Sequence, residues 1–387
     1  MTASRTVPRA AGPSALPTLA KLREQGTPIV MLTAYDYPTA RIAQAAGVDV
    51  VLVGDSAANV VLGYSSTREI SIDELLVLTR AARRGVDTVP LVGDLPFGSY
   101  ESSDDVAVAT ARRFAEEGGC DAVKLEGAGE MIARVRAIVA AGIPVVGHVG
   151  LLPQSVVTPE GYRAQGRDVE QALRIIDDSI ALEAAGCAAL VVEAVPAAVA
   201  ALITARVSIP VIGIGAGSAV SGQVLVFHDL LGLGEGHAAK FVKRYAEGRA
   251  VLEEGARRWA DDVRAGRYPA ESHTYAIAPE TLAAIIVEAV PAAVASLLTA
   301  RLSIPVIGIG AGAGTDGQVL VFHDLLGLGE GRVAKFVERY AEGRAILEDA
   351  ARRWADDVRA GRYPREEHTY AIAPETLAEV TRRLGRE

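Results

Sequence analysis

The chain has 387 residues, half of them apolar, which is enough to bury a large core and more than one ordinary domain needs. Its net charge of −9, without any cluster of Lys and Arg, argues against binding to nucleic acid or to an anionic membrane surface. No apolar run reaches the length of a membrane span, and the two cysteines, Cys120 and Cys187, are too few for a disulfide framework and fit a reducing cytoplasm.

The first 17 residues are rich in Ala, Pro, Ser and Arg and lack the continuous apolar core of a secretory signal. We therefore predict a flexible arm over residues 1–17. Eight short apolar runs bounded by turn residues follow, and each predicts a strand. They are residues 28–36, 48–56, 89–97, 122–127, 144–151, 188–196, 209–217 and 223–229.

Helical patterns separate most of these runs. The clearest are residues 72–84, 103–117 and 169–185, and two amphipathic stretches follow the last strand, at 237–254 and 256–265. Alternation of strands and helices predicts a parallel sheet, and eight such units in roughly 250 residues match the size of a closed barrel. The predicted fold is therefore an α/β protein with a (β/α)8 TIM barrel.

The sequence of the last part of the predicted barrel occurs twice in the chain. Residues 193–282 recur at 288–377 with a constant offset of 95 positions, and about 75 of about 90 aligned positions are identical. This indicates a tandem duplication, with a barrel domain at 18–282 and a copy of about 188–282 at 283–387. Eleven strands are too many for the barrel, so we expect the first copy to close it and the second to be surplus.

Acidic residues end four of the predicted strands. Asp55 ends the second, Asp94 the third, Glu126 the fourth and Glu193 the sixth. The carboxyl ends of barrel strands form one mouth, where (β/α)8 enzymes carry out their chemistry, so the four acids should converge. Buried like charges are costly unless protons or a cation compensate them, and carboxylate oxygens suit Mg²⁺ or Mn²⁺.

Each residue also has a structural interpretation. Asp55 and Asp94 could cap turns, and Glu126 could pair with Lys124 two residues earlier on the same face of the strand. His148 in strand five is equally consistent with a core histidine and with a substrate contact. The joint pattern of four acids at four strand ends nevertheless favours a site.

Two further features carry less weight. His228 and His323 fall within the predicted eighth strand of each copy and are expected to be structural. The glycine-rich run 213–217 follows the seventh strand, where many barrels hold phosphate, but such a run alone serves tight turning equally well.

The ordered motifs of the chain resemble those of the ketopantoate hydroxymethyltransferase family. The resemblance covers about Leu19 to His273, and the second copy resembles the last third of the family pattern again. The motifs are Thr-Ala-Tyr-Asp-Tyr at 33–37, Val-Gly-Asp-Ser at 53–56, Asp-Leu-Pro-Phe at 94–97, Val-Lys-Leu-Glu-Gly at 123–127, Gly-His-Val-Gly-Leu at 147–151, Pro-Gln-Ser at 153–155, Gly-Tyr-Arg-Ala-Gln-Gly at 161–166, Val-Glu-Ala-Val-Pro at 192–196 and Ile-Pro-Val-Ile-Gly-Ile-Gly-Ala-Gly at 209–217.

The resemblance implies an enzyme with a barrel of the phosphoenolpyruvate/pyruvate-like type. It implies transfer of a hydroxymethyl group from 5,10-methylenetetrahydrofolate to 3-methyl-2-oxobutanoate through a metal-stabilised enolate, giving 2-dehydropantoate for pantothenate synthesis. It further implies one Mg²⁺ per active site and a cytoplasmic homo-oligomer, in this family often a decamer.

Residue roles follow from the same resemblance. Asp55 and Asp94 would hold the metal with support from Glu126, while Ser56 and Lys124, together with Asp55 and Asp94, would bind the keto acid. Glu193 would be the general base, and Glu288 is its counterpart in the second copy.

Two alternatives stay open. One is a related carbon–carbon lyase of the phosphoenolpyruvate mutase and isocitrate lyase type, which typically uses a reactive cysteine in a mobile loop. Neither Cys120 nor Cys187 lies in a plausible loop, which disfavours this alternative. The other is a catalytically impaired assembly or scaffold protein, suggested by the duplication, which could expose unpaired strand edges.

Overall fold

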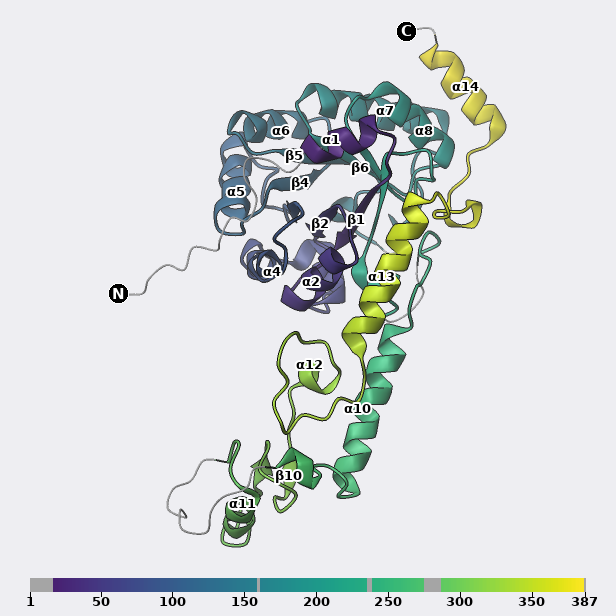
Figure 1. Cartoon of the computed structure of the whole chain (residues 1–387). Coiled ribbons are helices and arrows are strands. Elements are labelled where there is room, and N and C mark those ends of the chain that lie inside the picture. The colour runs from purple at the N-terminus through teal and green to yellow at the C-terminus, as the bar shows by residue number, and fades with distance from the viewer. Residues whose placement is uncertain (1–16, 159–160, 235–238, 275–286, 386–387) are drawn as a thin grey trace. The chain divides into compact units, whose positions relative to one another are not determined.

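The computed structural model describes residues 17–158, 161–234, 239–274 and 287–385 (Figure 1). The chain forms two compact units, and the division differs from the predicted one at residue 282. One unit contains residues 1–245 together with 348–387, and the other contains residues 246–347. In the described part of the chain, no helix is both long enough and apolar enough to cross a membrane.

Eight parallel strands close the barrel of the first unit, with each strand hydrogen-bonded to the next and β8 to β1. They are β1 (Ile29–Thr33), β2 (Val50–Val53), β3 (Leu91–Asp94), β4 (Ala122–Glu126), β5 (Val145–Gly150), β6 (Ala189–Glu193), β7 (Val211–Ile214) and β8 (Gly222–Leu225). Nearly all of their residues are buried, as expected for Val- and Ile-rich strands that are covered on both faces. The predicted barrel is confirmed, and the first copy of the repeat closes it.

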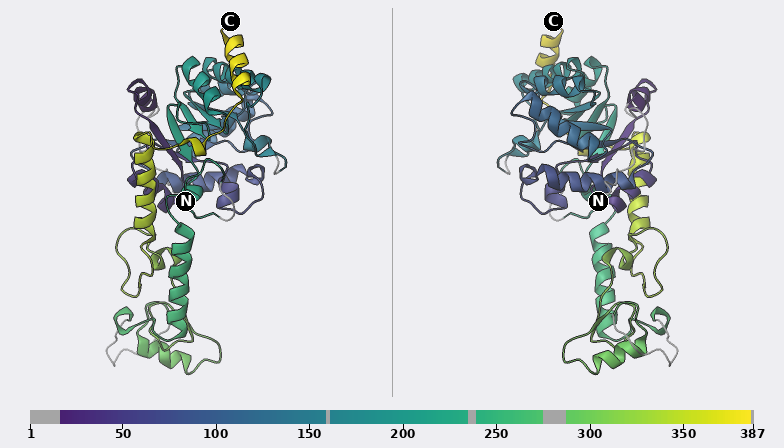
Figure 2. Two further views of the ribbon diagram at one scale, coloured as in Figure 1. Left: turned by 90° about the vertical axis from the view of Figure 1, so that its right-hand side faces the viewer. Right: turned by 90° about the vertical axis from the view of Figure 1, so that its left-hand side faces the viewer.

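Helices surround this barrel (Figure 2). Polar caps set their starts: Ser71 begins α4 with a reciprocal capping box to Glu74, and Ser103 begins α5 by accepting a hydrogen bond from the Val106 amide. The helices are α1 (Pro17–Glu24), α2 (Tyr37–Ala45), α3 (Ala57–Val60), α4 (Ile72–Gly85), α5 (Asp104–Glu116), α6 (Met131–Ala140), α7 (Val169–Ala184), α8 (Ala197–Arg206), α9 (Phe227–Leu230) and α14 (Pro374–Leu384), with short 3₁₀ turns η1 (Thr67–Glu69), η2 (Pro153–Ser155) and η5 (Glu366–His368).

Two predictions about the end of the first copy were wrong. His228 lies in the short helix α9 and not in strand eight, because β8 ends at Leu225, and His323 lies in the matching helix α12 (Phe322–Leu325). The two stretches predicted at 237–254 and 256–265 form one helix, α10 (Gly248–Arg264), of which residues 239–247 are not part. Residues 237 and 238 lie outside the described part of the chain.

The second unit contains α10 and most of the second copy. Its other elements are η4 (Glu271–His273), α11 (Ala292–Thr299), β9 (Ile307–Gly308), β10 (Gly317–Gln318), α12 and the first turn of α13 (Gly343–Arg359). The strands β9 and β10 are two residues long and pair only with each other, apart from one isolated bridge between Glu288 and Ile309. The repeated sequence does not rebuild full strands here because the neighbouring barrel strands are missing.

The end of the second copy packs on the barrel instead. Arg359 of α13 forms an ion pair with Asp49, with 3.2 Å between Nη2 and Oδ2, and Arg383 of α14 pairs with Glu170 of α7 at 2.7 Å. Residues 348–385 therefore belong to the barrel unit, while the equivalent part of the first copy belongs to the second unit. The prediction of a self-contained barrel at 18–282 followed by a surplus block differs from this arrangement.

A buried ion pair joins α4 to the start of β4 and gives a stability prediction. Arg83 contacts Asp121 at 3.1 Å, both side chains are almost fully buried, and Asp121 also accepts the Leu91 amide of β3. The substitution Arg83→Met should lower the free energy of unfolding by about 3–5 kcal/mol, because it leaves a buried carboxylate without its partner. Chemical denaturation would measure this, and a loss below about 1 kcal/mol would contradict it.

Candidate active site

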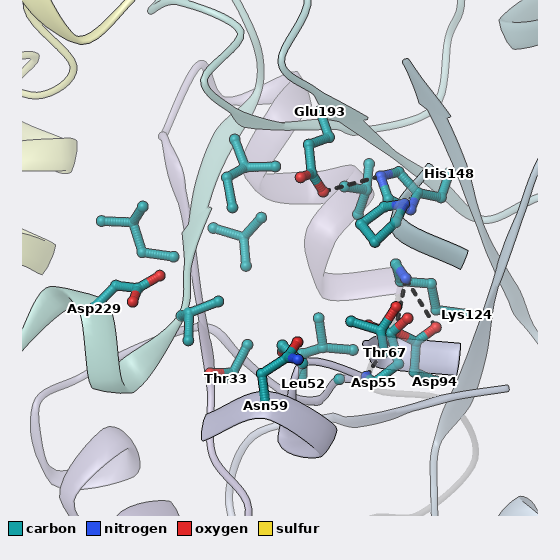
Figure 3. A pocket seen from close by; sticks show the side chains of 18 of the residues that line it. Thr33, Leu52, Asp55, Asn59, Thr67, Asp94, Lys124, His148, Glu193 and Asp229 are labelled. Carbon is teal, nitrogen blue, oxygen red and sulfur yellow. Dashed lines mark hydrogen bonds and ion pairs between the residues drawn. The ribbon is translucent and has the colours of Figure 1, made fainter. Parts of the chain in front are cut away.

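A cavity of about 380 Å³ opens at the carboxyl ends of the barrel strands (Figure 3). All the acids predicted from the strand ends line it, as do Lys124 and Ser56. The remaining lining residues are Thr33, Leu52, Gly54, Asn59, Ser65, Thr67, His148, Pro153, Tyr162, Val191, Ile214, Val224, Leu225, Val226, Asp229 and Phe241. The site that the sequence predicts at this end of the barrel therefore exists as a single space.

Asp55, Asp94 and Lys124 form a charged cluster on one side of the cavity (Figure 3). The Lys124 ammonium donates to both carboxylate oxygens of Asp94, at 2.8 and 2.7 Å. The Asp55 amide donates to Asp94 Oδ2 at 3.2 Å, which brings the two aspartates together. Lys124 thus pairs with Asp94 and not with Glu126, the partner considered from the sequence.

Hydrogen bonds of Gln154 connect this cluster to Glu126 at the end of β4. Its side-chain amide donates to Asp55 Oδ2 at 3.1 Å and to the Leu95 carbonyl at 3.0 Å, while its backbone amide donates to Glu126 Oε2 at 3.0 Å. The buried Tyr100 hydroxyl donates to Gln154 Oε1 at 2.8 Å. This network fixes the orientation of the carboxylates, because every polar atom of the Gln154 side chain has a partner.

His148 lies between two acids on the adjacent strands. Its Nδ1 is 3.3 Å from Glu126 Oε1 and its Nε2 is 3.4 Å from Glu193 Oε2, although the angles fall outside those of a hydrogen bond. Burial and Lys124 lower the pKa of His148, but the two carboxylates outweigh them and raise it to about 9. The two carboxylates therefore favour the protonated, positively charged form of His148, which lies between Glu126 and Glu193.

The charged cluster has the electrostatics of a cation site. Burial, followed by the charge of Asp94, raises the pKa of Asp55 to about 8. Burial also raises the pKa of Asp94, against the opposing charge of Lys124. Two adjacent carboxylates that are unfavourable as a charged pair would be stabilised by a divalent cation.

The donor set fits Mg²⁺ better than a metal that needs a full protein cage. Among the described residues, no three His, Cys, Asp or Glu side chains are grouped closely enough to hold a metal ion by themselves. Mg²⁺ is commonly bound by one or two carboxylates and takes its other ligands from water and substrate. Glu126 Oε1 has no hydrogen-bond donor, so it can accept from a cation-bound water.

The opposite wall of the cavity is mainly apolar and comes from β7, β8 and the segment after α9. Ile214, Val224 and Phe241 belong to these segments and line the cavity. Asp229 stands apart from the charged cluster (Figure 3). The Phe241 ring packs against Gly215, where a Cβ atom would come within 2.5 Å of Phe241 Cδ1. Gly215 also has a φ of +63°, so both its space and its backbone exclude larger residues.

The sequence missed some residues of the site. Gln154 and Tyr100 carry the hydrogen-bond network, and the only signal for Gln154 was its place in Pro-Gln-Ser just after β5. Ser56 was predicted, but its hydrogen bond to the Tyr35 hydroxyl, at 2.8 Å, was not. Glu288 is exposed in the second unit, whereas its counterpart Glu193 lines the cavity.

The fold is that of a (β/α)8-barrel enzyme, and its candidate active site is the acidic, lysine-containing cavity at the strand ends. The family model described as ketopantoate hydroxymethyltransferase matches residues 14–271 and again 273–366. The 3-methyl-2-oxobutanoate hydroxymethyltransferase of Geobacillus kaustophilus is 46% identical over 264 residues, covering 68% of this chain and 95% of that protein. The chain therefore belongs to the ketopantoate hydroxymethyltransferase family and is a transferase.

A second relative covers a similar share of the chain. The 3-methyl-2-oxobutanoate hydroxymethyltransferase of Frankia casuarinae is 51% identical over 257 residues, which is 66% of this chain and 86% of that protein. Among solved structures, phosphoenolpyruvate phosphomutase from Streptomyces platensis subsp. rosaceus aligns with a TM-score of 0.46 and 20% identity, over 69% of this chain and 92% of that chain.

Proposed function

We propose that this chain transfers a hydroxymethyl group from 5,10-methylenetetrahydrofolate to 3-methyl-2-oxobutanoate, giving 2-dehydropantoate for pantothenate synthesis. The observation that carries the proposal is the placement of Glu193 across one cavity from the Asp55–Asp94–Lys124 cluster (Figure 3). Such an arrangement holds a charged 2-oxo acid on one side and offers a base to its C3 hydrogen from the other. The names of the relatives support the same substrate.

Lys124 and Ser56 bind the keto acid in this proposal. Burial alone would lower the pKa of Lys124, but the surrounding carboxylates, Asp94 first, raise it above its ordinary value, so the ammonium is charged. This positive charge stabilises negative charge on the substrate as the C3 proton leaves. Ser56, held by Tyr35, provides a hydroxyl at the same end of the cavity.

Glu193 takes the C3 proton, and His148 orients it. The C3–H bond breaks, its electrons form the enolate, and the proton passes to the Glu193 carboxylate. The positively charged His148, 3.4 Å from Glu193 Oε2, restrains that carboxylate at the cavity wall. Water adds to the one-carbon unit of the folate while its two bonds to the folate nitrogens break, which releases tetrahydrofolate and leaves a carbon at the oxidation level of formaldehyde. The enolate carbon then bonds to that carbon, whose oxygen takes up a proton and becomes the new hydroxyl. No oxidant or reductant is needed.

Asp55 and Asp94 would hold one Mg²⁺, with Glu126 supporting it through water. When bound, the cation supplies Lewis-acid polarisation of the substrate ketone. Removal of divalent cations by chelation should lower formation of 2-dehydropantoate at least about 100-fold, and Mg²⁺ should restore it, because several kcal/mol of charge stabilisation are lost. Mass spectrometry of the product would measure this. Full activity in the chelated protein would contradict the cation site.

Product analysis is also the direct test of the proposed reaction. The purified chain, given 3-methyl-2-oxobutanoate, 5,10-methylenetetrahydrofolate and Mg²⁺, should release 2-dehydropantoate and tetrahydrofolate in equal amounts. A folded sample that forms neither product would count against the reaction. We further propose that the chain works in the cytoplasm as a homo-oligomer.

A further inference from the structure

The two copies have exchanged their C-terminal ends. The Tyr363 hydroxyl of the second copy donates to the Phe241 carbonyl of the first at 2.6 Å, and the Tyr268 hydroxyl of the first copy donates to the Phe336 carbonyl of the second, also at 2.6 Å. Each contact repeats the other at the offset of the duplication, 363 − 268 = 336 − 241 = 95. Each therefore joins the early part of one copy to the late part of the other.

Two further pairs show the same crossed pattern. The Tyr245 hydroxyl donates to Asp357 at 2.6 Å and the Tyr340 hydroxyl to Asp262 at 2.8 Å. Two lysine side chains make crossed contacts of the same kind. Lys240 donates to the Thr369 carbonyl at 2.6 Å, and Lys335 donates to the Thr274 carbonyl at 2.8 Å. The exchange is thus reciprocal between residues 262–274 of the first copy and residues 357–369 of the second.

One difference between the copies favours this arrangement over the unexchanged one. Position 255 is glycine in the first copy, and its counterpart in the second is Ala350. In the second unit a Cβ atom at position 255 would lie 2.6 Å from Leu326 Cδ2 and 3.2 Å from the Cβ of Ala341. In the barrel unit Ala350 is fully buried and accommodated. The alanine-bearing helix therefore suits the barrel, and the glycine-bearing helix suits the second unit.

The exchanged segment reaches the wall of the active site. Phe241, whose carbonyl accepts from Tyr363, lines the cavity and packs on Gly215. The Tyr370 ring lies against the same glycine, with 3.2 Å from its Cε2 to an ideal Cβ there, and the Tyr370 carbonyl accepts the Ala197 amide at 3.1 Å. Two residues of the second copy, Tyr363 and Tyr370, thus contact the residues that form the apolar wall of the first copy's barrel.

We propose that Tyr363 of the second copy is a positioning residue that fixes the Phe241 wall for the flat ring system of the one-carbon donor. The inference rests on the proposed function. The charged cluster of Asp55, Asp94 and Lys124 occupies the side that suits a keto acid, so the apolar wall with Phe241 remains for a planar heterocycle. The tandem copy is then part of the catalytic unit, because it supplies this support.

The duplication offers a matched control. Tyr363→Phe removes the hydroxyl that supports Phe241, while Tyr268→Phe removes the identical hydroxyl in the second unit. In the full chain, Tyr363→Phe should raise the KM for 5,10-methylenetetrahydrofolate roughly threefold to tenfold, as expected for one lost hydrogen bond. It should leave C3 hydrogen exchange of 3-methyl-2-oxobutanoate, measured without donor, within about twofold of the unmutated rate. Tyr268→Phe should change neither.

Each other outcome overturns the proposal. An effect of Tyr268→Phe alone, or equal effects of both variants, would mean that the ends are not exchanged in this way. A parallel loss of exchange and transfer in Tyr363→Phe would indicate general damage to the barrel, and an unchanged donor KM would exclude positioning. Calorimetry can also compare how tightly the two variants and the unmutated chain bind tetrahydrofolate. Because this measurement needs no turnover, it tests the role of Tyr363 even if the chain does not carry out the proposed transfer reaction.

Discussion

Replacing Glu193 by alanine should lower C3 hydrogen exchange of 3-methyl-2-oxobutanoate by about 10²- to 10⁴-fold, the range expected when a general base is lost. Glu193 lines the cavity across from the charged cluster, and its carboxylate lies 3.4 Å from His148 Nε2. NMR in heavy water would follow the exchange without donor. The expected loss tests the base assignment separately from every later step.

Glu288→Ala is the matched control for this variant. Glu288 has the same sequence neighbours as Glu193, since both begin the run Glu-Ala-Val-Pro, but it is exposed in the second unit. We expect unchanged exchange in Glu288→Ala. Loss of exchange in that variant, with retention in Glu193→Ala, would mean that the second copy supplies the active site.

Lys124→Met should lower the same exchange by about 10²- to 10³-fold. The ammonium is the only cation within hydrogen-bonding distance of Asp94 in the described structure, at 2.7 and 2.8 Å, and its loss removes positive charge from the place where the substrate becomes negative. Methionine keeps most of the side-chain volume, so packing changes little.

Cation binding separates a catalytic role of Lys124 from a structural one. Without the ammonium, Asp55 and Asp94 lose a competing positive charge, so Mn²⁺ binding measured by electron paramagnetic resonance should be retained or tightened. Loss of both exchange and Mn²⁺ binding would point to a collapsed site. Retained exchange would show that Lys124 does not stabilise the developing charge.

The barrel and its acids could be predicted because local sequence encodes them. Each strand is a short apolar run, and its last residue lies at the carboxyl end of the barrel, where the strand ends form one mouth. Asp94 and Glu126 are examples, since each is the final residue of its strand. Position along a strand therefore placed these acids correctly without any knowledge of their contacts.

The partners of these residues depend on long-range packing. Gln154 lies 99 positions from Asp55, whose carboxylate it contacts, and nothing in the spacing predicts that pair. His228 was assigned to a strand because the apolar pattern runs through Leu225 to Phe227, although the chain turns into α9 there. Periodicity alone does not show where a buried strand ends.

The exchange of C-terminal ends could not be predicted from the sequence, for a different reason. About 75 of about 90 positions are identical between the copies, so Asp262 and Asp357 offer the same contact to Tyr245. Identical contacts in the two copies do not determine which C-terminal end packs against which copy. Only positions that differ can do so, and Gly255 against Ala350 is such a position, whose effect requires the packing around it.

The most direct test of the account is C3 hydrogen exchange of 3-methyl-2-oxobutanoate by the unmutated chain in heavy water, followed by NMR with and without Mg²⁺. It isolates the proton transfer assigned to Glu193 and the charge stabilisation assigned to Asp55, Asp94 and Lys124. We predict exchange that depends on Mg²⁺ and needs no folate. A folded, Mg²⁺-loaded sample that shows no exchange would contradict the proposed function.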